Sequence, residues 1–160
     1  MIYLAIQVRQ NTSALQAASR QAISSGYRDC NRLRLQPEAA LAFARGLTDF
    51  QNLSFEERNF FGTITNDEAL FFQAVFALYE EGQLEEPTYM AYLNWFSSIV
   101  TSPGGAIWWE TTGRPIFVPG MVKAVDERIS LGNLFDVREL PQIRVSDLPS
   151  CDVAEEPDIK

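Results

Sequence analysis

Two adjacent carboxylates, Asp67 and Glu68, are the residues of this sequence that most suggest acid–base or metal chemistry. They interrupt an aromatic stretch with helical spacing, so one of them should lie near the buried face, where loss of water raises a carboxyl pKa. A simpler interpretation is a solvated face, or an ion pair with an arginine such as Arg45. Because the pair has no histidine and no regularly spaced partner, it is a weak indication of catalysis.

The two cysteines, Cys30 and Cys151, lie far apart and have no other cysteine nearby. This spacing argues against a zinc or redox motif and gives no sign of a disulfide framework, which favours a reducing compartment. Arg28 and Arg32 stand close to Cys30 and could lower the pKa of its thiol, as in a redox sensor. We favour an ordinary helix cysteine.

Histidine is absent from the whole sequence. Its absence excludes Ser-His-Asp and Cys-His activation of a nucleophile, zinc sites that contain histidine, and the Glu-x-x-His ligands of ferritin-like di-iron bundles. Acid–base work would fall to carboxylate, Lys, Tyr or Cys side chains. We therefore expect a protein that is not an enzyme and that has no catalytic residues, no metal site and no cofactor.

Aromatic residues supply the candidate binding site. Trp108 and Trp109 are neighbours about 100° apart on a helix, so one should be buried and the other partly exposed or set in a groove. A half-exposed tryptophan is typical of an interface anchor, although packing of both rings is the favoured interpretation. An internal cavity for an apolar ligand is a further alternative to a filled aromatic core. The candidate binding residues are Phe71, Phe76, Trp95, Trp108 and Trp109.

The net charge of −8 argues against a nucleic-acid partner, because binding phosphates requires a basic surface. The charge is unevenly distributed, at about +4 over residues 1–45 and about −12 over residues 46–160. An acidic cluster made of Glu80, Glu81, Glu85 and Glu86 should be a solvated loop, with a docking patch for a basic partner as the alternative.

Apolar residues recur at helical spacing along most of the chain and position these side chains. Ser54 and Glu57 form a capping-box pattern, and Pro37, Gly46 and Gly82 are placed as helix starts and stops. Helices are predicted from about residue 2 to the low thirties, over 37–45, 54–82 and 84–100, between Pro103 and Gly113, and over 119–129. The pattern predicts an all-α fold, a single antiparallel bundle of about five to six helices over 1–129. Residues 130–160 should form an irregular acidic tail that is extended or mobile.

The first predicted helix carries a thin apolar stripe at spacings of three, four and seven. Its residues are Met1, Leu4, Val8, Leu15, Ala18 and Ala22. Asn11 interrupts the stripe, and a buried polar residue of this kind can set the register of a coiled coil. The stripe therefore predicts either a homodimer through the first helix or packing on the chain's own bundle.

Four segments of the sequence resemble a group of small, uncharacterised bacterial proteins. They are IYLAIQVRQNT, LTDFQNLSFEERNFF, YEEGQLEEPTYMAYLNWF and SPGGAIWWE, and the resemblance extends over about residues 2–129. In that group an N-terminal transmembrane helix ends in a sequence like Tyr-Leu-Ala-x-Gln-(Ile/Val)-Arg-Gln-Asn-Thr and runs into a helical domain. The resemblance implies no activity and no functional residue. Because this sequence lacks the membrane span of that group, either the protein is a soluble variant or an inner-membrane anchor stands upstream of Met1.

The chain as given has no run of about 18 apolar residues, the length needed to cross a bilayer. Basic residues near a membrane helix stay in the cytoplasm, and Arg9 and Arg20 fall near that window. We therefore expect a cytoplasmic domain that is anchored to the inner membrane by a preceding segment.

The leading functional expectation is a non-enzymatic helical interaction or regulatory domain on the cytoplasmic side of a bacterial inner membrane, with a protein partner that the sequence does not identify. The alternative is a sensor that holds a small apolar or aromatic ligand within the bundle. An enzyme that uses the paired carboxylates Asp67 and Glu68 is third.

Overall fold

Helices form the fold throughout residues 2–139, which are the residues that the computed structural model describes. Within that range the chain has no strand. The long helices are α1 (Ile2–Cys30), α2 (Pro37–Asp49), α3 (Phe55–Glu80), α4 (Glu86–Val100) and α7 (Pro119–Ser130). The short helices α5 (Pro103–Trp108) and α6 (Arg114–Ile116) stand between the last two. The predicted all-α bundle with a long N-terminal helix is confirmed.

Local signals explain where these helices begin and end. The Ser54 hydroxyl accepts the Glu57 amide at 3.2 Å, and the Glu57 carboxylate accepts the Ser54 amide at 2.8 Å. This is the predicted capping box, and α3 starts directly after it. Gly82 follows α3 with φ of +70°, a conformation that glycine adopts without strain. Prolines stand in the first turns of α2, α4, α5 and α7, where their missing amide costs no hydrogen bond.

The prediction that Gly46 ends the second helix is wrong, because α2 continues to Asp49. Gly46 is buried inside the helix and faces the ring of Phe61. A Cβ atom at this position would lie 2.1 Å from Phe61 Cδ2. The glycine is therefore there to allow close packing of α2 on α3 and not to terminate a helix.

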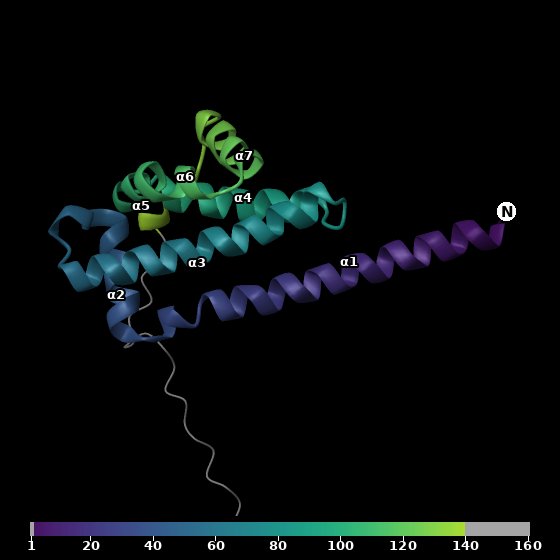
Figure 1. Ribbon diagram of the computed structural model, residues 1–160, viewed down its shortest axis with the longest axis horizontal. Helices are drawn as coiled ribbons and strands as arrows, with labels where there is room; N and C mark the ends of the chain where they lie inside the picture. Colours follow the sequence, from purple (N-terminus) through teal and green to yellow (C-terminus); the bar gives the residue numbers. More distant parts are fainter. Residues whose placement is uncertain (1, 140–160) are drawn as a thin grey trace, which may run out of the picture.

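The bundle is built around α3 (Figure 1). Helix α4 folds back antiparallel beside α3 after the turn at Gly82, α2 and α5 pack at the other end, and α7 packs on α4. The core is rich in aromatic rings, with Phe61, Phe72, Phe96 and Trp109 almost completely buried. Stacked pairs such as Phe72 with Phe96, at 5.3 Å between ring centroids, fill its centre.

Helix α1 lies along α3 for only part of its length. In Figure 1 its N-terminal half extends past the turn between α3 and α4. Ser19 and Ile23 are buried against the bundle, and the Tyr27 ring packs 5.5 Å from Phe71. Attachment of α1 thus comes from its C-terminal half.

Residues 131–139 belong to the predicted tail and are described by the structure. They pack on the bundle, since Val137 is 6% exposed and Phe135 stacks on Trp95 with ring centroids 5.9 Å apart. The remainder of the predicted tail, residues 140–160, lies outside the described residues, as does Met1.

Candidate functional site

Glu68 is the buried member of the carboxylate pair. Its side chain is 1% exposed, whereas Asp67 is only partly buried. The two residues follow each other in α3, so when one points into the core the other points along its edge. Glu68 pairs with Arg34, whose Nη2 lies 2.9 Å from Glu68 Oε1. Arg45 pairs instead with Glu57, so the predicted kind of partner is present but the arginine is a different one.

Four residues from different elements meet at this carboxylate, and we call them the Glu68 cluster. Its members are Cys30, Arg34, Glu68 and Trp95. The Trp95 indole Nε1 donates to Glu68 Oε2 at 3.2 Å, and the Cys30 thiol lies close enough for it and the Glu68 carboxyl to shift each other's pKa. The Arg34 guanidinium also lies over the Phe43 ring, 4.1 Å from its centroid. The cluster joins the end of α1 and the turn after it to α2, α3 and α4.

The Arg34–Glu68 pair is close but poorly aligned. Arg34 Nε, Arg34 Nη2 and Glu68 Oε1 are buried and make no hydrogen bond of good geometry. The attraction between the two groups is therefore mainly coulombic, and it acts in a region where water screens it little.

Burial dominates the ionisation of this cluster. It raises the pKa of the Glu68 carboxyl, although Arg34 and the Trp95 indole act in the opposite direction. Burial and the neighbouring Glu68 carboxylate raise the pKa of the Cys30 thiol to about 12. This direction agrees with the favoured interpretation of Cys30 as an ordinary helix cysteine, and the alternative, a thiol pKa lowered by Arg28 and Arg32, is wrong because burial and Glu68 raise it. Cys30 stays protonated and unreactive at neutral pH.

The geometry gives Glu68 a structural role. Its oxygens are held by Arg34 and Trp95, and no face of the carboxylate is open to a substrate. Sequence spacing could not identify Arg34 as its partner, since the two residues are far apart in the chain. The one local signal is that Cys30 and Arg34 are four residues apart, which places them on the same side of a helical turn.

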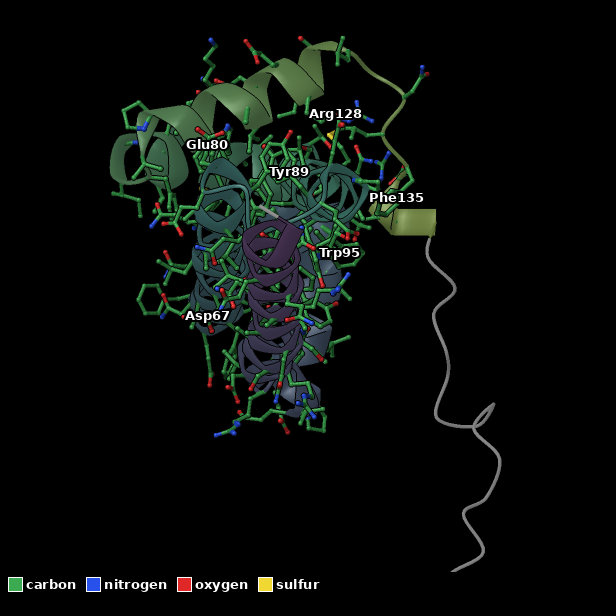
Figure 2. The ribbon with its side chains drawn as sticks, turned by 90° about the vertical axis from the view of Figure 1, so that its right-hand side faces the viewer. Asp67, Glu80, Tyr89, Trp95, Arg128 and Phe135 are labelled. Atoms are coloured by element: carbon green, nitrogen blue, oxygen red, sulfur yellow. The ribbon has the colours of Figure 1, made fainter. Side chains whose placement is uncertain are left out.

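Of the five aromatic candidates, Trp108 and Trp109 are buried in the core, whereas Phe71, Phe76 and Trp95 are partly buried and pack against it, and each has an aromatic neighbour from the chain itself. The pairs are Phe71 with Tyr92, Phe76 with Tyr89, Trp95 with Phe135, Trp108 with Phe117, and Trp109 with Phe96. Trp95 and Phe135 lie together at one side of the bundle (Figure 2). Trp108 and Trp109 also lie together, with centroids 6.4 Å apart. The rings pack on one another in the space where an apolar ligand would bind.

Both adjacent tryptophans are buried, at 7% exposure for Trp108 and 2% for Trp109. The favoured interpretation, in which both rings pack, is confirmed, and the alternative of a half-exposed anchor is wrong; the chain forms a π-helical turn over Trp109–Gly113. Such a turn is wider than an α-helical turn and reorients the side chains. A Cβ atom at Gly113 would lie 2.3 Å from Trp109 Cε3, so only glycine leaves room for the ring. The Trp109 indole donates to Asp126 Oδ1 of α7 at 3.2 Å.

The groove between α4, α5 and residues 134–138 has a volume of about 360 Å³. Its hydroxyls from Ser98, Thr101 and Ser102 donate to backbone carbonyls of their own helical turns. Asp136 and Arg138 pair with each other at its edge. The polar groups are thus engaged within the chain, which gives a ligand few groups to recognise.

The acidic cluster is solvated, as predicted. Glu80, Glu81, Glu85 and Glu86 are all exposed around the turn between α3 and α4. Glu85 Oε1 lies 3.3 Å from Arg20 Nη1 of α1, an exposed pair of the kind that contributes little stability.

The clearest exposed feature is one side of α1. Leu15 is 51% exposed, and Asn11, Ala18 and Ala22 are exposed as well. We call these four residues the α1 stripe. Between them lies a shallow hollow of about 590 Å³ lined by Asn11, Thr12, Ala14, Leu15 and Ala18. The stripe does not pack on the bundle, which was one of the two predicted outcomes.

Among residues 2–139, no group of three or more acidic or cysteine side chains is arranged to hold a metal ion. Over the same range, no helix combines the length and the apolar character that a bilayer crossing requires. Comparison with family models, with curated proteins and with solved structures finds no match to this chain.

Proposed function

We propose that this chain is a non-enzymatic helical interaction domain, and that the α1 stripe is the surface that its protein partner binds. The observation that carries this proposal is the exposure of the stripe on a helix whose N-terminal half extends past the bundle (Figure 1). The side chains that α1 buries in the bundle come from another side of the helix, at Ser19 and Ile23. The stripe is thus not needed for the fold of a single chain.

The composition of α1 supports a partner surface. Between Ile2 and Tyr27 the only charged residues are Arg9 and Arg20. A helix that faces water on most sides usually carries charges in i, i+4 pairs, and a helical segment of this length is marginal on its own. A protein that covers the stripe would remove its apolar side chains from water and stabilise the N-terminal half of α1.

A matched pair of variants tests this proposal in pull-down experiments with the purified domain as bait. Leu15→Glu with Ala18→Glu places two carboxylates on the stripe. Ala17→Glu with Ser24→Glu places the same charges on exposed positions of α1 that lie outside the stripe. We expect the wild-type and control baits to capture the same protein and the stripe variant to lose it. Equal capture by all three baits, or saturable capture by none, contradicts the proposal.

We also propose that the domain lies at the cytoplasmic face of a bacterial inner membrane, next to an anchor. The segment IYLAIQVRQNT resembles the cytoplasmic end of a membrane helix, and the arginines of α1 suit that side. The N-terminal end of α1 points away from the bundle, so an anchor there would leave the bundle clear of lipid (Figure 1). Fractionation of native cells tests this. Recovery in the soluble fraction contradicts the anchor, and digestion by protease added to spheroplasts contradicts the orientation.

A further inference from the structure

We infer that the partner of the α1 stripe is a second copy of this chain, paired with the first as a parallel, in-register coiled coil through α1. This inference rests on the proposed function, because it identifies the partner of the same surface. Four features of α1 carry it: the spacing of the stripe, its position relative to the bundle, the absence of charge at its borders, and Asn11.

The α1 stripe, together with Leu4 and Val8 before it in the sequence, repeats with the period of a two-stranded coiled coil. In heptad notation, Val8, Leu15 and Ala22 occupy a positions, and Leu4, Asn11 and Ala18 occupy d positions. Alternating spacings of three and four residues keep such a seam facing a partner helix. The pattern lasts about three heptads, which is the usual minimum for a coiled coil.

The residues that line the hollow on α1 are those that would form a hole for a knob residue of a second helix. In a parallel pair, the side chain at an a position inserts among four residues of the facing helix. For Leu15 these four are Asn11, Ala14, Leu15 and Ala18 of the second copy. All four line the exposed hollow, and the two alanines make it wide enough to receive a leucine.

The bundle leaves room for the second helix. At 100° per residue, the bundle-facing positions Gly26, Ser19 and Ile23 lie roughly 50°, 70° and 110° from the centre of the stripe around the helix axis. A two-fold axis along the seam therefore places the two bundles on opposite sides of the helix pair.

The borders of the stripe carry no charge between Ile2 and Tyr27. The e and g positions hold Ala5, Gln7, Thr12, Ala14 and Gln21, together with the bundle-facing Ser19 and Gly26. Arg9 and Arg20 occupy b and f positions, away from the seam. Identical parallel helices bring their border residues together, so like charges there would repel. This sequence avoids that repulsion in a chain of which 21% of the residues are charged.

Asn11 selects both the partner and the orientation. Its amide is a donor and an acceptor, so two copies in register can hydrogen-bond to each other across the seam. An antiparallel pair of α1 helices centred between Leu4 and Ala22 would place Asn11 opposite Leu15. If lipid covered the stripe instead, it would offer the Asn11 amide no hydrogen-bond partner. Burial of an amide without a partner is costly in both cases. A parallel pair satisfies the amide.

The seam is small, so the dimer should be weak. A strip about 28 Å long and about 10 Å wide on each helix gives roughly 560 Å² in total. This area is below the approximately 1,200 Å² that marks the lower end of stable interfaces. We expect dissociation in the micromolar range.

Sedimentation equilibrium of the full chain from about 1 to about 300 μM tests the inference. We expect the mass to double with concentration for wild type and for Ala17→Glu with Ser24→Glu. Leu15→Glu with Ala18→Glu should weaken association by at least about 100-fold, without changing the circular dichroism spectrum, because these positions are exposed. A monomer at every concentration, or association that the stripe variant retains, overturns the inference.

Cross-linking tests the orientation. Ala18→Cys places a thiol at a d position, so a parallel in-register pair should form a disulfide between the two introduced cysteines under mild oxidation, identified by mass spectrometry. Ala17→Cys points away from the seam and should not. Both variants carry Cys151→Ser, and Cys30 interferes little, because burial raises the pKa of its thiol to about 12. A dimer without the disulfide at position 18 overturns the parallel register.

The two proposals fail in different ways. If the chain stays monomeric while pull-down recovers another protein through the stripe, the proposed function survives and the second copy is excluded. If neither measurement responds to Leu15→Glu with Ala18→Glu, both proposals are wrong.

Discussion

A carboxylate that is removed from water stabilises a fold only while its partners stay in place, and Glu68 has two of them in Arg34 and Trp95. The same carboxylate raises the pKa of the Cys30 thiol, so three helices and the turn after α1 depend on one buried charge. The Glu68 cluster is therefore the point at which the C-terminal end of α1 is joined to the core.

Replacement of Arg34 by methionine should expose this dependence. The variant leaves a carboxylate that is 1% exposed without its cationic partner. Breaking a buried ion pair in this way costs about 3–5 kcal/mol, and the lower end applies because the Arg34 side chain is 18% exposed. We expect the free energy of unfolding at pH 7, measured with urea, to fall by about 3 kcal/mol. The double variant Arg34→Met with Glu68→Gln should recover most of this loss.

The loss in Arg34→Met should also depend on pH. Burial raises the pKa of Glu68 above its ordinary value of 4.5, so the folded state binds the proton more tightly than the unfolded state does. The stability contributed by this group is thus greatest at low pH and falls as the pH rises from 4.5 through the folded pKa. Without Arg34, the pKa of Glu68 in the folded state rises further, so stability is lost over a wider range of pH. The difference from wild type should be larger at pH 8 than at pH 5, and equal differences contradict the proposed role.

Asp126 offers a second test at the residue scale. Its Oδ1 accepts the buried Trp109 indole, and its Oδ2 lies 2.6 Å from Arg114 Nη1. Asp126→Ala leaves the indole N–H unsatisfied, which costs about 1–3 kcal/mol. Asp126→Asn keeps an acceptor and loses only a half-exposed ion pair, so it should cost less than about 1 kcal/mol. Urea denaturation of both variants measures the difference, and the same loss in both excludes a role for the indole hydrogen bond.

At the scale of elements, close approach of helices depends on particular glycines. The Phe61 ring against Gly46 is completely buried, and Phe43 and Phe50 pack on it with centroids 5.6 and 5.4 Å away. The ring has no free space to move into. Gly104 allows α5 to approach α2 closely at the same place, since a Cβ atom at Gly104 would lie 2.4 Å from the Gly46 carbonyl oxygen.

Two glycine-to-alanine variants should therefore change stability in opposite directions. Gly46→Ala forces a methyl group into Phe61 and should lower the free energy of unfolding by about 1–3 kcal/mol. Gly62→Ala is the matched control within α3, where a Cβ atom meets nothing within 4 Å. Alanine is the better helix former, so this variant should gain about 1 kcal/mol. Chemical denaturation measures both, and a gain in both would show that α2 and α3 are not closely packed.

The sequence predicted the helices better than it predicted their ends. The capping box at Ser54 and the stop at Gly82 act within a few residues, and both are confirmed. Gly46 and Gly113 have the same local appearance as a helix stop, but their roles come from rings that lie against them in the folded chain. The residues next to a glycine in the sequence do not show whether it is needed for close packing or for ending a helix.

Prediction of the candidate site was limited in the same way, because its contacts join residues that are far apart in the sequence. Helical periodicity correctly placed one of Asp67 and Glu68 near the core, but the identity of Arg34 as partner depends on how α1 and α3 are arranged. Packing of both Trp108 and Trp109 is the interpretation that the sequence favours, and it is confirmed, whereas the π-helical turn over Trp109–Gly113 has no local sequence signal. The exposure of the α1 stripe likewise follows from which side of α1 the bundle covers.

At the scale of the whole molecule, α1 is attached near one end and exposed near the other. Ile23, Tyr27 and the Glu68 cluster hold its C-terminal half, whereas the exposed Arg20–Glu85 pair adds little.

Deletion of residues 2–14 should separate the roles of the two halves of α1. The buried contacts that we describe begin at Ser19, so the bundle in a dilute sample should melt within about 3 °C of wild type, the shift that about 1 kcal/mol produces. Wild type should gain thermal stability as its concentration rises, because association stabilises the folded state, and the truncated chain should not. Deletion of residues 2–34 is the control, since it leaves Glu68 without Arg34 and should lower the melting temperature strongly. A comparable drop after removal of residues 2–14 alone would show that the projecting half supports the bundle of its own chain and is not a free surface for a partner.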